Sequence, residues 1–277
     1  MQRVDQMIRG RIAQLDTQQV AVSFIDLASG RELHINGEIS MHAASTMKVP
    51  VLLELYRRAE EDRSFSLDRP VEVRNVFKSI ADTSHYSLDA GDDSDSLVYT
   101  LVGNSASPRY LGRRMIIRSS NLATNLLIEL LGAANIRQTL ARVDGTGMRV
   151  LRGVEDGPAF RKGLNNTTTS YGFAKALEAI ARCRVTSRAA CDEMLDILAG
   201  QEFNEMIPAG VPAGTRIAHK TGWITGIRHD GGIVFPPTRE PYVLVVLTRG
   251  FEDPADADRV GAEISRIVWH AIGPGLR

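Results

Sequence analysis

Short β-rich segments lie at both ends of this 277-residue chain, and the long stretch between them has a helical pattern. The N-terminal pair, residues 20–26 and 31–35, flanks a Ser29-Gly30 turn signal, which is typical of a β-hairpin. Three further β-rich runs lie near the other end, at residues 216–221, 231–235 and 242–248. The simplest architecture that uses strands from both ends is one antiparallel sheet, with the other elements packed on it.

The sequence also predicts the helices that cover this sheet. Apolar residues recur at helical spacing near both termini, as in Val4, Ile8 and Ile12, and predict two terminal helices. Five helical segments are expected between the strands, at residues 46–61, 108–132, 135–143, 170–183 and 187–199. Residues 82–104 are rich in Asp, Ser and Gly, and we expect a surface excursion of the kind that borders functional sites.

The predicted architecture is therefore α/β (α+β). It is an antiparallel sheet with flanking terminal helices and an inserted all-helical lobe. We expect residues 1–50 and 203–277 to form an α/β lobe and residues 51–202 to form the helical lobe. The active site is expected between the two lobes.

Composition excludes several classes of function. The chain has 33 basic and 33 acidic residues, so it lacks the electrostatic footprint of a nucleic-acid or anionic-membrane binder. No segment approaches the length of a membrane span. Its six histidines are scattered and no CxxC spacing occurs, so no metal site is predicted. We expect a monomer that binds a small-molecule substrate.

Two cysteines leave one question open. Cys183 and Cys191 are close enough in sequence to permit a disulfide across a loop between two helices. Two free thiols packed in a helical region are the alternative.

A serine and a lysine stand three residues apart where an apolar helix is expected to begin. Ser45 and Lys48 precede the apolar residues 49–53, and this spacing places both side chains on one helical face. A serine hydroxyl needs an adjacent base, and a lysine serves when desolvation and nearby positive charge lower its pKa. A helix N-terminus also favours developing negative charge. Alone the pattern is weak, because a capping serine followed by a solvated lysine is common.

Two further elements carry groups that suit the same chemistry. Ser119 and Asn121 precede a helical run; the serine can relay a proton and the amide can hold Lys48 and a substrate carbonyl, although a helix N-cap is the plain alternative. Lys220-Thr221-Gly222 ends a predicted strand. Its lysine and threonine can bind a substrate carboxylate. The N–H of Trp223 can form an oxyanion hole with that of Ser45.

In the order S-x-x-K, S-x-N and K-T-G, these elements resemble the class A β-lactamases and penicillin-binding serine hydrolases. Residues 42–48, 121–127 and 166–169 are similar to the family's sequences around its nucleophile, its middle motif and the exit of its Ω-loop. The resemblance implies a β-lactamase/transpeptidase-like fold and no cofactor. The catalytic residues that it implies are Ser45, Lys48, Ser119 and Glu155; the substrate-binding residues are Asn121, Lys220, Thr221, Gly222 and Trp223.

The chain departs from the family pattern around its expected deacylation base. Class A enzymes carry an Ω-loop glutamate, with an asparagine four residues later, that positions a water. Glu155 is the natural candidate here, but Ala159 stands where that asparagine is expected. Asp156 is the second candidate for the deacylation base. Asn165 or Asn166 could take the place of the asparagine that holds the water. A solvated surface glutamate is the alternative for Glu155.

The resemblance implies that Ser45 forms an acyl-enzyme with a β-lactam or a related amide. A penicillin-binding D-alanyl-D-alanine carboxypeptidase or an esterase with poor lactam turnover is the alternative, and an acylated penicillin sensor is the non-enzyme alternative. Arg228 or His229 is considered as an additional positive charge toward a substrate carboxylate. A periplasmic or secreted location is expected from the family. Met1 to Gln6 lack the apolar core of a secretory signal, which leaves a cytoplasmic location open.

Overall fold

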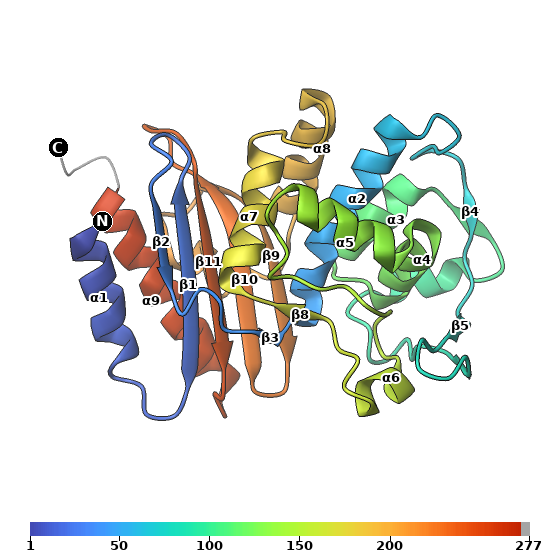
Figure 1. Ribbon diagram of the computed structural model, residues 1–277, viewed down its shortest axis with the longest axis horizontal. Helices are drawn as coiled ribbons and strands as arrows, with labels where there is room; N and C mark the ends of the chain where they lie inside the picture. Colours follow the sequence, from blue (N-terminus) through green and yellow to red (C-terminus); the bar gives the residue numbers. More distant parts are fainter. Residues whose placement is uncertain (273–277) are drawn as a thin grey trace.

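A five-stranded antiparallel sheet forms the centre of the computed structural model, which describes residues 1–272 (Figure 1). In spatial order its strands are β2 (Glu32–Ile35), β1 (Gln19–Asp26), β11 (Tyr242–Arg249), β10 (Ile227–Phe235) and β9 (Arg216–Ile224). The two ends of the chain meet where β1 pairs antiparallel with β11, with Val22 opposite Val246. The predicted sheet built from both ends is confirmed.

Helices cover both faces of this sheet. The terminal helices α1 (Gln2–Ile12) and α9 (Pro254–Ile272) lie on one face, and α7 (Ser170–Ala181) and α8 (Arg188–Ala199) lie on the other (Figure 1). Strand β1 shows why both faces are buried. Its Val22 packs in a cluster with α1 and α9, whereas the adjacent Ala21 packs in a cluster with α7, because successive side chains of a strand point to opposite faces.

The helical middle contains two breaks. The expected stretch 46–61 begins as a 3-10 turn, η1 (Ala44–Met47), and continues as α2 (Lys48–Glu61), with Pro50 in the first turn, where its missing N–H costs little. The expected stretch 108–132 is two helices, because Ser119 has a φ of 60°. The helices that follow α2 are α3 (Pro108–Ile117), α4 (Asn121–Leu131), α5 (Ala133–Arg142) and α6 (Gly157–Arg161).

Short strand pairs and 3-10 turns organise the connections. They are β3 (Met41–His42) with β8 (Thr167–Thr168), β4 (Val71–Glu72) with β7 (Ser105–Ala106), β5 (Phe77–Lys78) with β6 (His85–Tyr86), η2 (Ser96–Leu101) and η3 (Pro208–Gly210). The polar excursion 82–104 thus contains β6 and η2.

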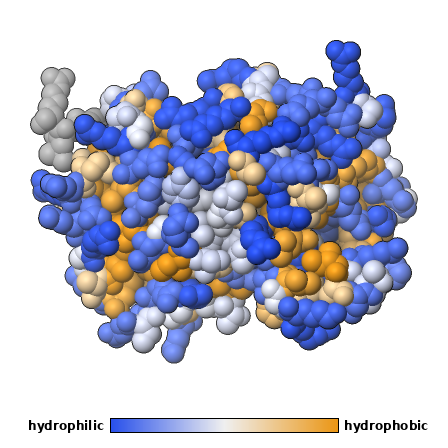
Figure 2. All heavy atoms as spheres, in the orientation of Figure 1, coloured by the Kyte–Doolittle hydropathy of each residue, from blue (hydrophilic) through white to orange (hydrophobic). Residues whose placement is uncertain are grey.

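Cys183 and Cys191 form a disulfide between the end of α7 and α8, with their Cα atoms 5.7 Å apart. The structure therefore has the first of the two alternatives that the sequence left open. Across residues 1–272, no helix combines the length and the apolar character that crossing a membrane requires. Figure 2 shows hydrophilic side chains over most of one face, with smaller hydrophobic areas between them.

Two helical glycines give opposite stability predictions. A Cβ on Gly172 of α7 would lie 2.7 Å from the Cα of Gly147, whereas a Cβ on Gly10 of α1 would meet no heavy atom within 4 Å. Gly172→Ala should lower the free energy of unfolding by about 1–3 kcal/mol through overpacking. Gly10→Ala should raise it by about 0.5–1 kcal/mol through helix propensity. Urea denaturation measures both; a stabilising Gly172→Ala would contradict the close contact.

Candidate active site

Ser45 lies on η1, where the chain enters α2, and lines a cavity of about 450 Å³. The residue before it, Ala44, has a φ of 45°, a left-handed conformation that an alanine rarely adopts. The N–H of Ala44 donates to Nδ1 of His42, which anchors this strained turn. Backbone strain of this kind costs about 1–3 kcal/mol and is often found at functional sites.

Lys48 is fully buried, and its amine reaches the second motif. Nζ donates to the carbonyl oxygen of Ser119 at 2.6 Å, to Ser119 Oγ at 3.1 Å and to Asn121 Oδ1 at 2.9 Å. Burial lowers the pKa of Lys48 to about 7, against the opposing effect of the negative charges of Asp93 and Glu155. A substantial fraction of the amine is therefore neutral, and able to accept a proton, at neutral pH.

The start of α4 holds the second motif in place. Ser119 is in the left-handed region and almost fully buried, and the hydroxyl of Ser120 accepts from Ala123 N as the helix cap. One turn further on, Asn125 makes two hydrogen bonds to the backbone of Val154, donating to its carbonyl at 3.0 Å and accepting from its N–H at 2.6 Å. The loop after residue 150 is thereby tied to α4.

The third motif passes close to Ser45. A Cβ on Gly222 would lie 2.8 Å from the backbone nitrogen of Ser45, so only glycine allows strand β9 to approach this closely. Lys220 is fully buried, and its Nζ donates to the carbonyl of Thr221 at 2.9 Å. Burial and the nearby Lys48 hold the pKa of Lys220 well below its usual value, although Asp230 opposes the shift. Within residues 1–272, the buried Oγ1 of Thr221 has no hydrogen-bond partner.

Glu155 lies on the cavity wall, and its Oε1 accepts from Asn121 Nδ2 at 3.1 Å. Partial desolvation raises its pKa; the Asn121 hydrogen bond opposes this, whereas the carboxylates of Asp93 and Asp92 add to it. Glu155 has a φ of 63°, and the adjacent Val154 also lines the cavity.

The alternative candidates Asp156, Asn165 and Asn166 form hydrogen bonds with groups other than Glu155. Asp156 is fully buried; its carboxylate accepts from the hydroxyl of Ser79 and from the N–H of Ala159. Asn165 Oδ1 accepts from Arg152, and Asn166 Oδ1 accepts from the N–H of Arg152. Ala159 is buried. The structure therefore gives Glu155 no asparagine from this loop as a hydrogen-bond partner within residues 1–272.

Arg228 and His229 do not join the cavity. Arg228 pairs with Asp258 at 3.3 Å and lies over the ring of Trp223. His229 is buried, its Nε2 lies 3.1 Å from the carbonyl oxygen of His42, and burial lowers its pKa to about 4. Neither side chain lines the cavity.

Sequence reasoning missed several residues that line the cavity. They include Asp92, Asp93 and Ser94 from the excursion and Arg152 from the loop before Glu155. The Asp-rich composition of residues 82–104 was the only signal for the first three. Across residues 1–272, no group of His, Cys, Asp and Glu side chains is arranged to hold a metal ion.

Comparisons with known proteins identify the family of this chain. A family model described as "Beta-lactamase enzyme family" matches residues 3–272. Beta-lactamase 1 of Streptomyces cacaoi is 26% identical over 258 residues, covering 88% of this chain and 76% of that protein. Beta-lactamase AST-1 of Nocardia asteroides is 27% identical over 271 residues, covering 95% and 83%.

Solved structures show the same fold. The structure of PBP-A superposes with a TM-score of 0.82 at 26% identity, covering 97% of this chain and 95% of the other. A beta-lactamase from Sphaerobacter thermophilus superposes with a TM-score of 0.80 at 25% identity, covering 97% and 96%. Because the family model spans nearly the whole chain and the fold agrees, this protein belongs to the beta-lactamase enzyme family, whose members are enzymes of the serine-hydrolase type.

Proposed function

We propose that the protein hydrolyses a β-lactam or a related amide through an acyl-enzyme on Ser45. The observation that carries this proposal is the Lys48 amine, which is fully buried, bonded to Ser119 Oγ and lowered in pKa to about 7, one helical turn from Ser45. Such an amine supplies the base that a serine nucleophile needs.

Acylation follows from these positions. Neutral Lys48 accepts the proton of Ser45 Oγ as that oxygen attacks the substrate carbonyl. The N–H groups of Ser45 and Trp223 stabilise the oxyanion, a contribution of about 2.7–4 kcal/mol for each donor in comparable sites. Ser119, 3.1 Å from Lys48 Nζ, passes the proton to the leaving nitrogen as the amide bond breaks.

Substrate binding uses the other buried amine. A substrate carboxylate beside Lys220 favours the protonated form of this amine, so binding forms an ion pair that the free enzyme lacks. The buried Thr221 Oγ1, which has no hydrogen-bond partner among residues 1–272, is expected to donate to the same carboxylate. Asn121 orders Lys48, and Glu155 activates the water that hydrolyses the acyl-enzyme.

A penicillin-binding peptidase with slow lactam turnover is the second candidate. It is favoured by the apolar Val154 on the cavity wall and by the buried Ala159 where a water-holding asparagine is expected. A solved relative, a point mutant of PBP-A, forms an acyl-enzyme complex with penicillin G and is 27% identical to this chain. Steady turnover of a chromogenic cephalosporin supports the first candidate, and a stoichiometric burst that stalls supports the second.

Ser45→Ala should abolish covalent labelling by a fluorescent penicillin, because the variant lacks the attacking oxygen. Ser94→Ala is the matched control, since Ser94 lines the same cavity and donates its hydroxyl to the carbonyl of Arg118. The control should retain labelling. If the Ser45→Ala variant still gives a labelled band on a denaturing gel, Ser45 is not the nucleophile.

The acylation rate should rise with pH through a pKa of about 7, that of Lys48. The neutral amine is the base, so the rate is full above this pKa and falls by about tenfold for each pH unit below it. Stopped-flow acylation between about pH 5 and pH 9 measures the profile. A rate that is constant over this range, or that rises only near the usual lysine pKa, would contradict the assignment.

Glu155→Gln should slow deacylation by about 10²–10⁴-fold, the usual contribution of a general base, while acylation changes much less. Glu129→Gln is the control, since Glu129 pairs with Arg74 instead of lining the cavity. Single-turnover kinetics with a cephalosporin separate the two steps. If neither step changes, Glu155 is a surface glutamate and the second candidate gains support.

A further inference from the structure

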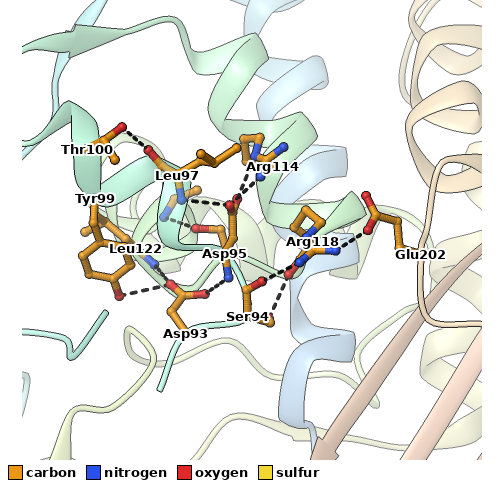
Figure 3. A network of polar contacts seen from close by, with 12 residues as sticks. Asp93, Ser94, Asp95, Leu97, Tyr99, Thr100, Arg114, Arg118, Leu122 and Glu202 are labelled. Carbon is orange, nitrogen blue, oxygen red and sulfur yellow. Dashed lines mark hydrogen bonds and ion pairs between the residues drawn. The ribbon is translucent and has the colours of Figure 1, made fainter. Parts of the chain in front are cut away.

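Asp93 belongs to the excursion 82–104, which the motifs of the active site do not include. Its side chain is nevertheless buried, with 8% of the residue exposed, and lines the same cavity as Ser45. Figure 3 shows Asp93 at the lower edge of a polar network, with Tyr99, Leu122 at the start of α4, and Asp95 bonded to its carboxylate.

Both oxygens of the Asp93 carboxylate accept hydrogen bonds. Oδ2 accepts from the N–H of Asn121 at 2.8 Å, from the N–H of Leu122 at 3.0 Å and from the hydroxyl of Tyr99 at 3.1 Å. Oδ1 accepts from the N–H of Asp95 at 3.1 Å. Four donors therefore point at this buried carboxylate, whose negative charge acts on Lys48 and on Glu155.

These bonds fix the residue that connects the two proposed catalytic groups. The side chain of Asn121 accepts from Lys48 Nζ and donates to Glu155 Oε1, so any displacement of its backbone alters both contacts. The middle motif of class A enzymes reads Ser-Asp-Asn. Ser120 occupies the middle position here, and the carboxylate at the start of this helix comes from Asp93, on a different segment.

Asp93 also provides a negative charge near Lys48, whose own hydrogen-bond partners are neutral. Within residues 1–272, the hydrogen bonds of Lys48 Nζ go to neutral oxygens of Ser119 and Asn121. The charged groups that face this amine are Asp93 and Glu155, which favour its protonated form, and Lys220, which opposes it. Glu155 in turn faces Asp93, Asp92 and Lys48.

We propose that Asp93 is a positioning residue of the active site, which holds Asn121 through the start of α4 and provides the buried negative charge opposite Lys48 and Glu155. The proposal rests on the proposed function in that it assigns roles to these two groups. It predicts two separable effects, one on the position of Asn121 and one on the protonation of Lys48 and Glu155.

Removing the charge of Asp93 changes the pKa of Lys48 and the pKa of Glu155 in the same direction. Without the Asp93 charge, the protonated Lys48 amine is less favoured, so its pKa falls. The ionised Glu155 carboxylate is repelled less, so its pKa falls too. In Asp93→Asn, the acidic limbs of acylation and of deacylation should both move to lower pH, by about 0.5–1 unit for one nearby charge. A residue with a merely structural role would lower the rates equally at all pH values.

The experiment compares Asp93→Asn with Asp95→Asn, a buried neighbour that pairs with Arg114. Lys48 is titrated in the unliganded proteins by NMR of isotope-labelled lysine, which needs no substrate, and the acylation and deacylation profiles are then measured with penicillin. We expect the Lys48 titration and both limbs to move to lower pH in Asp93→Asn only. An unchanged Lys48 titration, or equal shifts in the two variants, would overturn the charge role.

The variant Asp93→Glu tests the positioning role separately from the charge role. It also replaces Asp93→Asn as the test if that variant does not fold. It keeps the charge but lengthens the side chain, so the Lys48 titration should stay within about 0.3 units of wild type while the acylation rate falls. Wild-type acylation in Asp93→Glu would overturn the positioning role. If the titration shifts as expected in Asp93→Asn but penicillin never acylates the wild type, the proposed function fails and the charge role of Asp93 stands.

Discussion

The desolvation of the Lys48 amine is the interaction on which the site depends. A buried ammonium is costly unless its surroundings compensate it, and here compensation is partial: three neutral oxygens accept its hydrogen bonds, and the nearest negative charges are not in direct contact. The amine therefore releases its proton near neutral pH. Ser119 and Asn121 contact this amine directly, and Asp93 accepts from the backbone of Asn121.

The fold provides this enclosure because the two ends of the chain share one sheet. Pairing of β1 with β11 places β9 at the edge of the sheet, where Gly222 passes against the backbone of Ser45. The helical middle then brings α4 to the other side of the same cavity. Three of the seven non-glycine residues with positive φ within residues 1–272, Ala44, Ser119 and Glu155, lie at this junction.

The sheet, its terminal helices and the three motifs could be predicted because each depends on local spacing: alternation in strands, helical periodicity, and short patterns in a fixed order. Other features depend on contacts between distant segments. Asp93 meets Asn121 across 28 residues of sequence, and Arg228 is directed to Asp258 instead of the cavity. Glu155 likewise meets Asn121 across 34 residues of sequence, a contact that no local pattern predicts.

The central claim, that Ser45 forms an acyl-enzyme in this cavity, is tested most directly by mass spectrometry of the protein after brief exposure to a penicillin, with peptide mapping over time. We expect one added penicillin on the peptide that contains Ser45, followed by loss of that mass as the ester hydrolyses. A protein that gains no mass, or that carries the adduct on a peptide without Ser45, would contradict it.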